Sequence, residues 1–107
     1  KFDDPQVGMM LAYTGAVKDG IMDLEELAVH LLELLNRRYP KTLEERYGVT
    51  MPPETPGYVL LEAAGRRRGF LLARGEINTE RMAKVLLDEF RGGKLGRFTL
   101  EMPEETT

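Results

Sequence analysis

Apolar residues recur every three or four positions along much of the chain, a spacing that places them on one face of an α-helix. The longest such run spans residues 23–38, and its apolar positions are Leu24, Leu27, Ala28, Leu31, Leu32 and Leu35. Asp23 and Glu26 have the spacing of a capping box, which predicts the start of the helix, and Pro40 stops it. We expect this segment to be the core helix of the molecule.

Four further segments show helical periodicity or helix-boundary residues. The expected helices are residues 4 or 5–14, 40–47, 55 or 56–68 and 79–91. Gly15 is the predicted stop of the first, Gly48 and Gly69 of the next two, and Asn78 caps the last. Residues 16–22 then form a connection. The pattern predicts an all-α fold, a single small helical bundle of about five helices.

Two apolar segments lie outside these helices. The run Phe70, Leu71 and Leu72 is expected to tuck under the core because it is short and entirely apolar. Residues 94–102 alternate weakly at Phe98 and Leu100, which predicts a short extended C-terminal arm that packs on the helices. Residues 103–107 are expected to be a frayed tail.

Positive charge is concentrated in residues 65–97, where nine basic residues face four acidic ones, although the whole chain carries a net charge of −3. Such asymmetry favours a surface that meets a polyanion; a solvated, salt-bridged helical face is the alternative. The candidate RNA-binding residues are Arg66, Arg67, Arg68, Arg74, Arg81, Lys84, Arg91, Lys94 and Arg97. Gly92, Gly93 and Gly96 would let backbone amides approach a sugar-phosphate chain, or would simply end a helix.

Several kinds of site are excluded or disfavoured by the sequence. The 107 residues make one domain at most, and they contain no cysteine and a single histidine, His30, which excludes thiolate and multi-histidine metal sites. The sequence Gly93-Lys94 is followed by Leu95, so no phosphate loop is present. The acidic pairs are adjacent in sequence and diverge on helices, and no apolar run is long enough to span a membrane. We expect no catalysis by this chain.

Four segments, in order, are similar to the C-terminal part of the ribosome biogenesis GTPase A family, circularly permuted GTPases of late large-subunit assembly. They are LAYTGAVKDGIMDLEELAVHLL, YPKTLEERYGV, LLEAAGRRRGFLLARGEIN and FRGGKLGRFTLE. Residues 1–4 resemble the junction after the family's GTPase domain. The resemblance implies that residues 1–22 are this junction with a first helix, and that the chain is a fragment starting just downstream of the GTPase domain.

The resemblance also implies a function. Residues 23–102 resemble antiterminator-like RNA-binding domains, which implies docking on ribosomal RNA of the large subunit or a pre-ribosomal particle. GTP and Mg²⁺ would be bound by the GTPase domain of the parent protein, with no cofactor in this chain. The expected location is the bacterial cytoplasm, as a monomer without membrane contact. The chain departs from the family at Arg74, where glycine is more usual, so a turn that favours glycine would be stiffened there.

An alternative function is a protein-interaction module. Apolar residues near the N-terminus, Phe2, Val7, Met9 and Met10, would then pack against the parent GTPase domain and couple its nucleotide state to partner binding. The two functions are compatible, because one domain can use opposite faces for RNA and for protein.

Overall fold

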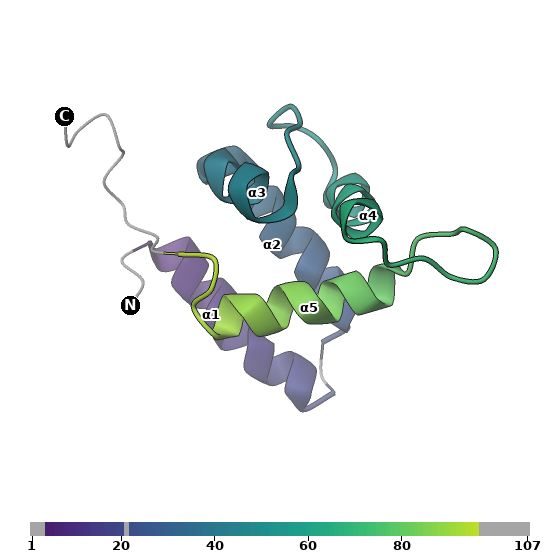
Figure 1. Ribbon diagram of the computed structural model, residues 1–107. Coiled ribbons are helices and arrows are strands. Elements are labelled where there is room, and N and C mark those ends of the chain that lie inside the picture. Colours follow the sequence, from purple (N-terminus) through teal and green to yellow (C-terminus); the bar gives the residue numbers. More distant parts are fainter. Residues whose placement is uncertain (1–3, 21, 97–107) are drawn as a thin grey trace.

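In the computed structural model, which describes residues 4–20 and 22–96, helix α2 (Leu24–Arg38) lies at the centre of the fold. It contacts each of the other four helices, α1 (Pro5–Lys18), α3 (Pro40–Tyr47), α4 (Gly57–Arg68) and α5 (Thr79–Arg91). In Figure 1, α5 crosses in front of α2, with α3 and α4 above it. The described residues form no strand beyond one isolated bridge, so the predicted five-helix, all-α bundle is confirmed.

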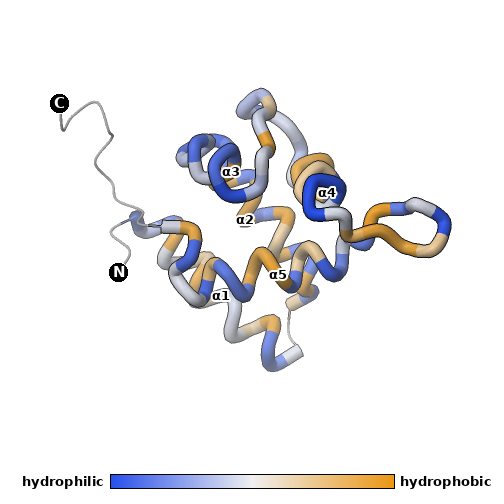
Figure 2. Tube along the Cα trace, viewed as in Figure 1, coloured by the Kyte–Doolittle hydropathy of each residue, from blue (hydrophilic) through white to orange (hydrophobic). Residues whose placement is uncertain are grey.

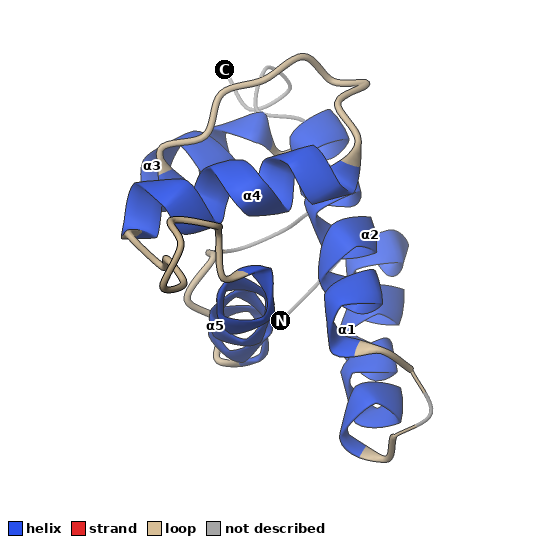
Figure 3. Cartoon of the chain, turned by 90° about the vertical axis from the view of Figure 1, so that its right-hand side faces the viewer, coloured by secondary structure: helices blue, strands red, loops and turns tan. Residues whose placement is uncertain are grey.

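The apolar stripe of α2 forms the core, as its periodicity predicts. Leu27, Ala28, Leu31, Leu32 and Leu35 are all buried, whereas Leu24 at the start of the helix is half-buried. Helices α4 and α5 pack on this stripe, and in Figure 3 α4 lies above α5, which is seen nearly end-on. Phe90 of α5 is among the largest fully buried side chains. Fully burying one leucine of the α2 stripe contributes about 2 kcal/mol to the free energy of unfolding, so the packing around α2 holds the bundle together.

Local signals at the helix ends act as predicted. The Asp23 carboxylate accepts a hydrogen bond from the backbone N–H of Glu26 at 3.1 Å, and the Asn78 side chain accepts one from Arg81 at 3.1 Å. Gly48 and Gly69 end α3 and α4 in the left-handed conformation, with φ of 69° and 74°. These caps fix where α2 to α5 begin or end.

The first helix is longer than predicted. Helix α1 continues through Gly15 to Lys18, so the predicted stop at Gly15 was wrong and the connection predicted for residues 16–22 begins only after Lys18. Gly15 stays helical, and Val17 beyond it packs against the core, which favours continuing the helix. The chain turns instead at Gly20, whose φ is 77°.

A buried carboxylate fixes the start of α1 to the end of α2. Asp4 is fully buried and accepts hydrogen bonds from the N–H of Gln6 at 2.9 Å and from the Tyr39 hydroxyl, and it pairs with Arg38 at 3.1 Å. Burial and the neighbouring Asp4 raise the pKa of Tyr39 to about 12. The cluster caps α1 and holds its first turn against α2.

The connection between α4 and α5 folds back on itself, and we call it the α4–α5 hairpin (residues 70–78). The N–H of Leu72 donates to the carbonyl of Glu76 and that of Asn78 to the carbonyl of Phe70, both at 2.7 Å. One antiparallel bridge joins Leu71 and Ile77. The hairpin projects from the helices in Figure 1.

The prediction that Phe70, Leu71 and Leu72 tuck under the core was wrong for the two leucines. Phe70 packs against the core, but Leu71 and Leu72 are 54% and 47% exposed. The hairpin closes its own backbone hydrogen bonds and so carries both side chains outward. Figure 2 shows the projecting loop with an apolar first half and a polar stretch beyond it.

Most of the predicted C-terminal arm lies outside the described residues. Phe98, Leu100 and the tail 103–107 are among them, whereas Leu95 is described and buried. Within residues 4–20 and 22–96, no helix is long and apolar enough to cross a membrane.

Candidate nucleic-acid interface

The candidate basic residues fall into separate places on the structure, and the first is the end of α4 with the adjoining hairpin. Four exposed arginines lie here: Arg66 and Arg67 on the last turn of α4, Arg74 on the hairpin, and Arg81 on the first turn of α5. We call these four residues the arginine end. Among the described residues, no carboxylate lies within ion-pair distance of these four. Arg81 stacks on the Phe70 ring, with its guanidinium carbon 4.1 Å from the ring centroid. Within the part of the chain that the structure describes, the arginine end therefore carries positive charge without a paired carboxylate.

Arg67 is also held in place by α3. A Cβ atom built at Gly48 would lie 2.6 Å from Nε of Arg67, so the guanidinium rests directly on this glycine. Gly48 is the C-terminal cap of α3, and the C-terminal end of a helix favours a cation. The contact orders the Arg67 side chain while leaving the residue exposed.

Arg68, the third arginine of the triplet, is engaged by Glu89 of α5. Its Nη2 lies 3.5 Å from Oε1 of Glu89, and its guanidinium carbon lies 5.1 Å from the centroid of the Tyr47 ring. The Tyr47 hydroxyl donates to the same oxygen at 2.7 Å, and Nε of Arg46 does so at 3.3 Å. We call these four residues the Glu89 cluster; it joins α3, α4 and α5.

The cluster changes the titration of its members. Burial alone would raise the pKa of the Glu89 carboxyl, but hydrogen bonds from Arg46 and Tyr47 and the charge of Arg68 outweigh it, so the pKa lies below its ordinary value. Burial and the hydrogen bond to Glu89 raise the pKa of Tyr47. Glu89 thus stays ionised at neutral pH and compensates part of the charge of Arg46 and Arg68.

Lys84 and Arg91 lie on the other flank of α5. They line a groove between α1 and α5, which we call the α1–α5 groove, together with Lys18, Glu80 and Asp88. Acidic and basic side chains alternate there, as on a solvated helical face. None of the four arginine-end residues lines this groove, although Arg81 precedes Lys84 by only three residues on α5.

Lys94 lies in a third place, beside α3. It is exposed and lines a groove with Arg46 and the acidic Glu45, so the groove between the Glu89 cluster and the loop after α5 has mixed charge. Gly92, Gly93 and Gly96 in this loop are exposed, and Gly93 and Gly96 have φ of 75° and 100°. Their contact with a sugar-phosphate chain stays a prediction, and Arg97 lies outside the described residues.

Arg46 was not among the candidate residues. No spacing rule pairs it with Glu89, which is 43 residues away in sequence. The only sequence signal is its place in the last turn of α3, where basic residues are favoured by the helix dipole.

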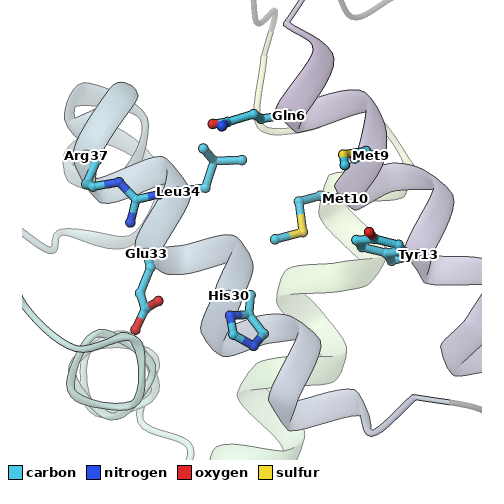
Figure 4. A pocket seen from close by; sticks show the side chains of 8 residues that line it. All are labelled: Gln6, Met9, Met10, Tyr13, His30, Glu33, Leu34 and Arg37. Carbon is cyan, nitrogen blue, oxygen red and sulfur yellow. The ribbon is translucent and has the colours of Figure 1, made fainter.

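The predicted interdomain residues lie partly in a groove between α1 and α2, which we call the α1–α2 groove. Met9 is 53% exposed, Met10 is partly buried, and His30 lies across from them on α2 (Figure 4). Val7 is fully buried in the chain's own core, so its prediction as an interdomain contact was wrong. Val7 is covered because α1 packs on both α2 and α5. Phe2 lies outside the described residues.

The α1–α2 groove also contains a residue that sequence reasoning missed. Tyr13 is 41% exposed and lines the groove, whose volume is about 340 Å³. It follows Met9 by four residues, a spacing that places both on one helical face and could have identified it.

The described residues offer no donor set for the Mg²⁺ that the family resemblance implies. No group of three or more His, Cys, Asp or Glu side chains in residues 4–20 and 22–96 is placed to hold a metal ion. The binding of GTP and Mg²⁺ in another part of the parent protein stays a prediction.

Comparison with known proteins identifies relatives over nearly the whole chain. No family model matches the sequence. A protein of Bacillus cereus named ribosome biogenesis GTPase A is 44% identical over 105 residues, which cover 98% of this chain and 35% of the relative. The Bacillus pumilus protein of the same name is 40% identical over 104 residues, covering 97% and 36%.

A more distant relative matches over a similar length of the chain. The Mycoplasma genitalium protein named probable ribosome biogenesis GTPase A is 23% identical over 103 residues, covering 95% of this chain and 35% of the relative. The chain thus spans about a third of the length of the curated relatives it matches. The resemblance read from the four sequence segments is confirmed.

Proposed function

Nearly the whole of this chain matches about a third of the length of each ribosome biogenesis GTPase A relative. We propose that the chain docks its parent protein on ribosomal RNA of the large subunit. The observation that carries the proposal is the arginine end, a set of exposed arginines without carboxylate partners among the described residues. GTP hydrolysis would belong to another part of the parent protein. The docking would take place in the bacterial cytoplasm, with this region acting as a monomer.

The arrangement suits phosphate contacts. Guanidinium groups bind phosphate oxygens with two parallel hydrogen bonds, and such contacts release counterions. Arg66 and Arg67 point in different directions from the last turn of α4, and Arg74 lies on the projecting hairpin. These arginines can therefore contact phosphates in more than one direction. Structured RNA would be recognised mainly by its shape.

A salt series tests the proposal. The 107-residue chain should bind purified large-subunit ribosomal RNA with an affinity that falls linearly with the logarithm of salt concentration. The variant Arg66→Ala/Arg67→Ala should reduce that slope by about 1.5 to 2. The matched control Lys84→Ala/Arg91→Ala removes the same charge from the α1–α5 groove and should leave the slope nearly unchanged. Absence of salt-dependent binding by the wild-type chain would refute RNA docking.

A second candidate function is supported by the α1–α2 groove. Its exposed Met9 and Tyr13 form an adaptable apolar surface suited to contact with the parent GTPase domain. If the groove couples the two domains, Met9→Ser/Tyr13→Ser should weaken association of this chain with the separately produced GTPase region. Unchanged association, measured by calorimetry with both proteins folded, would remove the support for this function.

A further inference from the structure

The α4–α5 hairpin combines exposed leucines with neighbouring arginines, and phosphate binding requires only the arginines. Leu71 and Leu72 are 54% and 47% exposed and adjacent, so they place two large apolar side chains together on the surface. They lie within the most basic part of the chain, where residues 66–81 contain five arginines and two glutamates. Figure 2 shows this apolar stretch on the projecting loop, away from the helical core.

The hairpin presents these leucines on an ordered support. The N–H of Gly75 donates to the carbonyl of Leu72 at 2.9 Å, inside the two hydrogen bonds that join Leu72 to Glu76 and Asn78 to Phe70. Gly75 takes the left-handed φ of 83° that the turn requires. At the base of the hairpin, Phe70 is fixed between the core and the guanidinium of Arg81. Little ordering entropy would therefore be lost when the leucines meet a partner.

The surrounding charge selects the kind of partner. A polyanion is drawn to Arg66, Arg67, Arg74 and Arg81, but the outside of a paired RNA helix offers phosphates, riboses and base edges, which give leucine side chains little apolar surface. The apolar faces of RNA bases become accessible where a base is unstacked, in a loop or bulge. Leucine is among the apolar side chains that wedge between base steps in DNA minor-groove complexes, so the same contact is chemically open to an unstacked RNA base. RNA with an unstacked base offers both an anionic backbone and an apolar face, and so matches both features of the hairpin.

We infer that the α4–α5 hairpin binds an unstacked base of the RNA through Leu71 and Leu72 while the neighbouring arginines hold its phosphates. This inference rests on the proposed RNA-docking function. It adds that the chain prefers RNA with an unstacked base over a continuous RNA duplex. The arginines then supply the salt-dependent part of the affinity, and the leucines supply a part that does not depend on salt.

The test uses the double variant Leu71→Ser/Leu72→Ser in the 107-residue chain and two RNA probes. One probe is purified large-subunit ribosomal RNA and the other is a fully paired RNA duplex. Because the leucines would bury apolar surface against the base, the variant should bind the ribosomal RNA about tenfold more weakly, with the same salt slope as the wild type, and bind the duplex equally well. Met9→Ser, which removes an exposed apolar side chain elsewhere, should change neither affinity.

Thermal unfolding serves as the control for folding. Because both leucines are exposed, their replacement should leave the melting temperature nearly unchanged. Equal binding of the ribosomal RNA by variant and wild type would overturn the inference, and would leave a protein surface as the partner of the leucines. Equal weakening on both probes would also overturn it. Failure of the wild-type chain to bind either RNA would instead refute the docking function itself.

Discussion

The arginine end and the α1–α5 groove carry similar side chains but differ in their charge environment. At the arginine end, Arg66 and Arg67 are exposed and no described carboxylate pairs with them. In the groove, Lys84 and Arg91 alternate with Glu80 and Asp88. Both sets come from one basic stretch of sequence. No described carboxylate pairs with Lys84 or Arg91 either. The difference lies in the setting: the groove cations share one depression with two carboxylates, whereas Arg74 stands on the projecting hairpin. We expect this setting, and not local net charge alone, to decide which surface binds a polyanion.

Helix α5 explains the difference. Its buried stripe faces α2, leaving two flanks that meet different neighbours. Glu89 on one flank joins Arg68 and Arg46, and Asp88 on the other lines the α1–α5 groove. These adjacent carboxylates therefore act on different surfaces, and changing them one at a time separates the two.

The largest expected effect on stability comes from disturbing the contact between α4 and α2, which positions the arginine end. Helix α4 starts against α2, where a Cβ at Gly57 would lie 2.2 Å from the carbonyl oxygen of Val29. Gly57→Ala should lower the free energy of unfolding by about 1–3 kcal/mol, because backbone has to move. The matched change Gly8→Ala adds a methyl group in open space within α1 and should stabilise by about 0.5–1 kcal/mol. Chemical denaturation measures both, and similar effects would show that α4 does not need close contact here.

The next prediction sharpens the contrast between the flanks of α5. Glu89→Gln removes the carboxylate that engages Arg46 and Arg68, so binding to large-subunit ribosomal RNA should strengthen and the salt slope should steepen by about 1. Stability should fall by about 1 kcal/mol through weaker hydrogen bonding. Asp88→Asn makes the same charge change in the α1–α5 groove and should have little effect on either quantity. Equal gains in binding would mean that net charge alone matters.

The pH dependence of the free energy of unfolding tests the role of the Glu89 carboxylate separately. The Glu89 pKa in the folded chain is below its ordinary value of 4.5, so its contribution is fully present above about pH 4.5 and is lost as the pH falls through the folded pKa. The free energy of unfolding should therefore fall more steeply for the wild type than for Glu89→Gln on acidification below pH 4.5. Parallel curves would contradict an ionised Glu89 that is stabilised by its partners.

The smallest expected effect is at the tip of the hairpin. The structure has no described non-glycine residue at positive φ, so Arg74 causes no strain and Gly75 takes the left-handed position. Arg74→Gly should change the free energy of unfolding by less than about 1 kcal/mol and reduce the salt slope of RNA binding by about 1. Gly75→Ala keeps the charge but strains the turn, so it should lower stability by about 1 kcal/mol with an unchanged slope. A large stabilisation by Arg74→Gly would show that the turn favours glycine there.

Helix ends were predictable because their signals are local. Asp23, Gly48, Gly69 and Asn78 act within three or four residues of their own position, and each lies where the sequence placed it. The stop at Gly15 failed because glycine permits a turn without requiring one, and packing beyond it prolonged the helix.

The candidate site was less predictable because its contacts are distant in sequence. Glu89 lies 43 residues from Arg46 and 21 from Arg68, so nothing in the sequence showed which arginine of the triplet would be compensated. The same applies to Leu71 and Leu72, whose apolar run fits equally a buried link and a projecting hairpin. The hydrogen bonds that close residues 70–78 decide between them.

The most direct test of RNA docking by the arginine end compares two charge reversals of equal size. Arg66→Glu/Arg67→Glu alters the arginine end, and Lys84→Glu/Arg91→Glu alters the α1–α5 groove by the same charge. At one fixed salt concentration, the first variant should bind large-subunit ribosomal RNA at least about tenfold more weakly than the second. Equal affinities, with both variants folded, would contradict the assignment of the RNA surface to the end of α4.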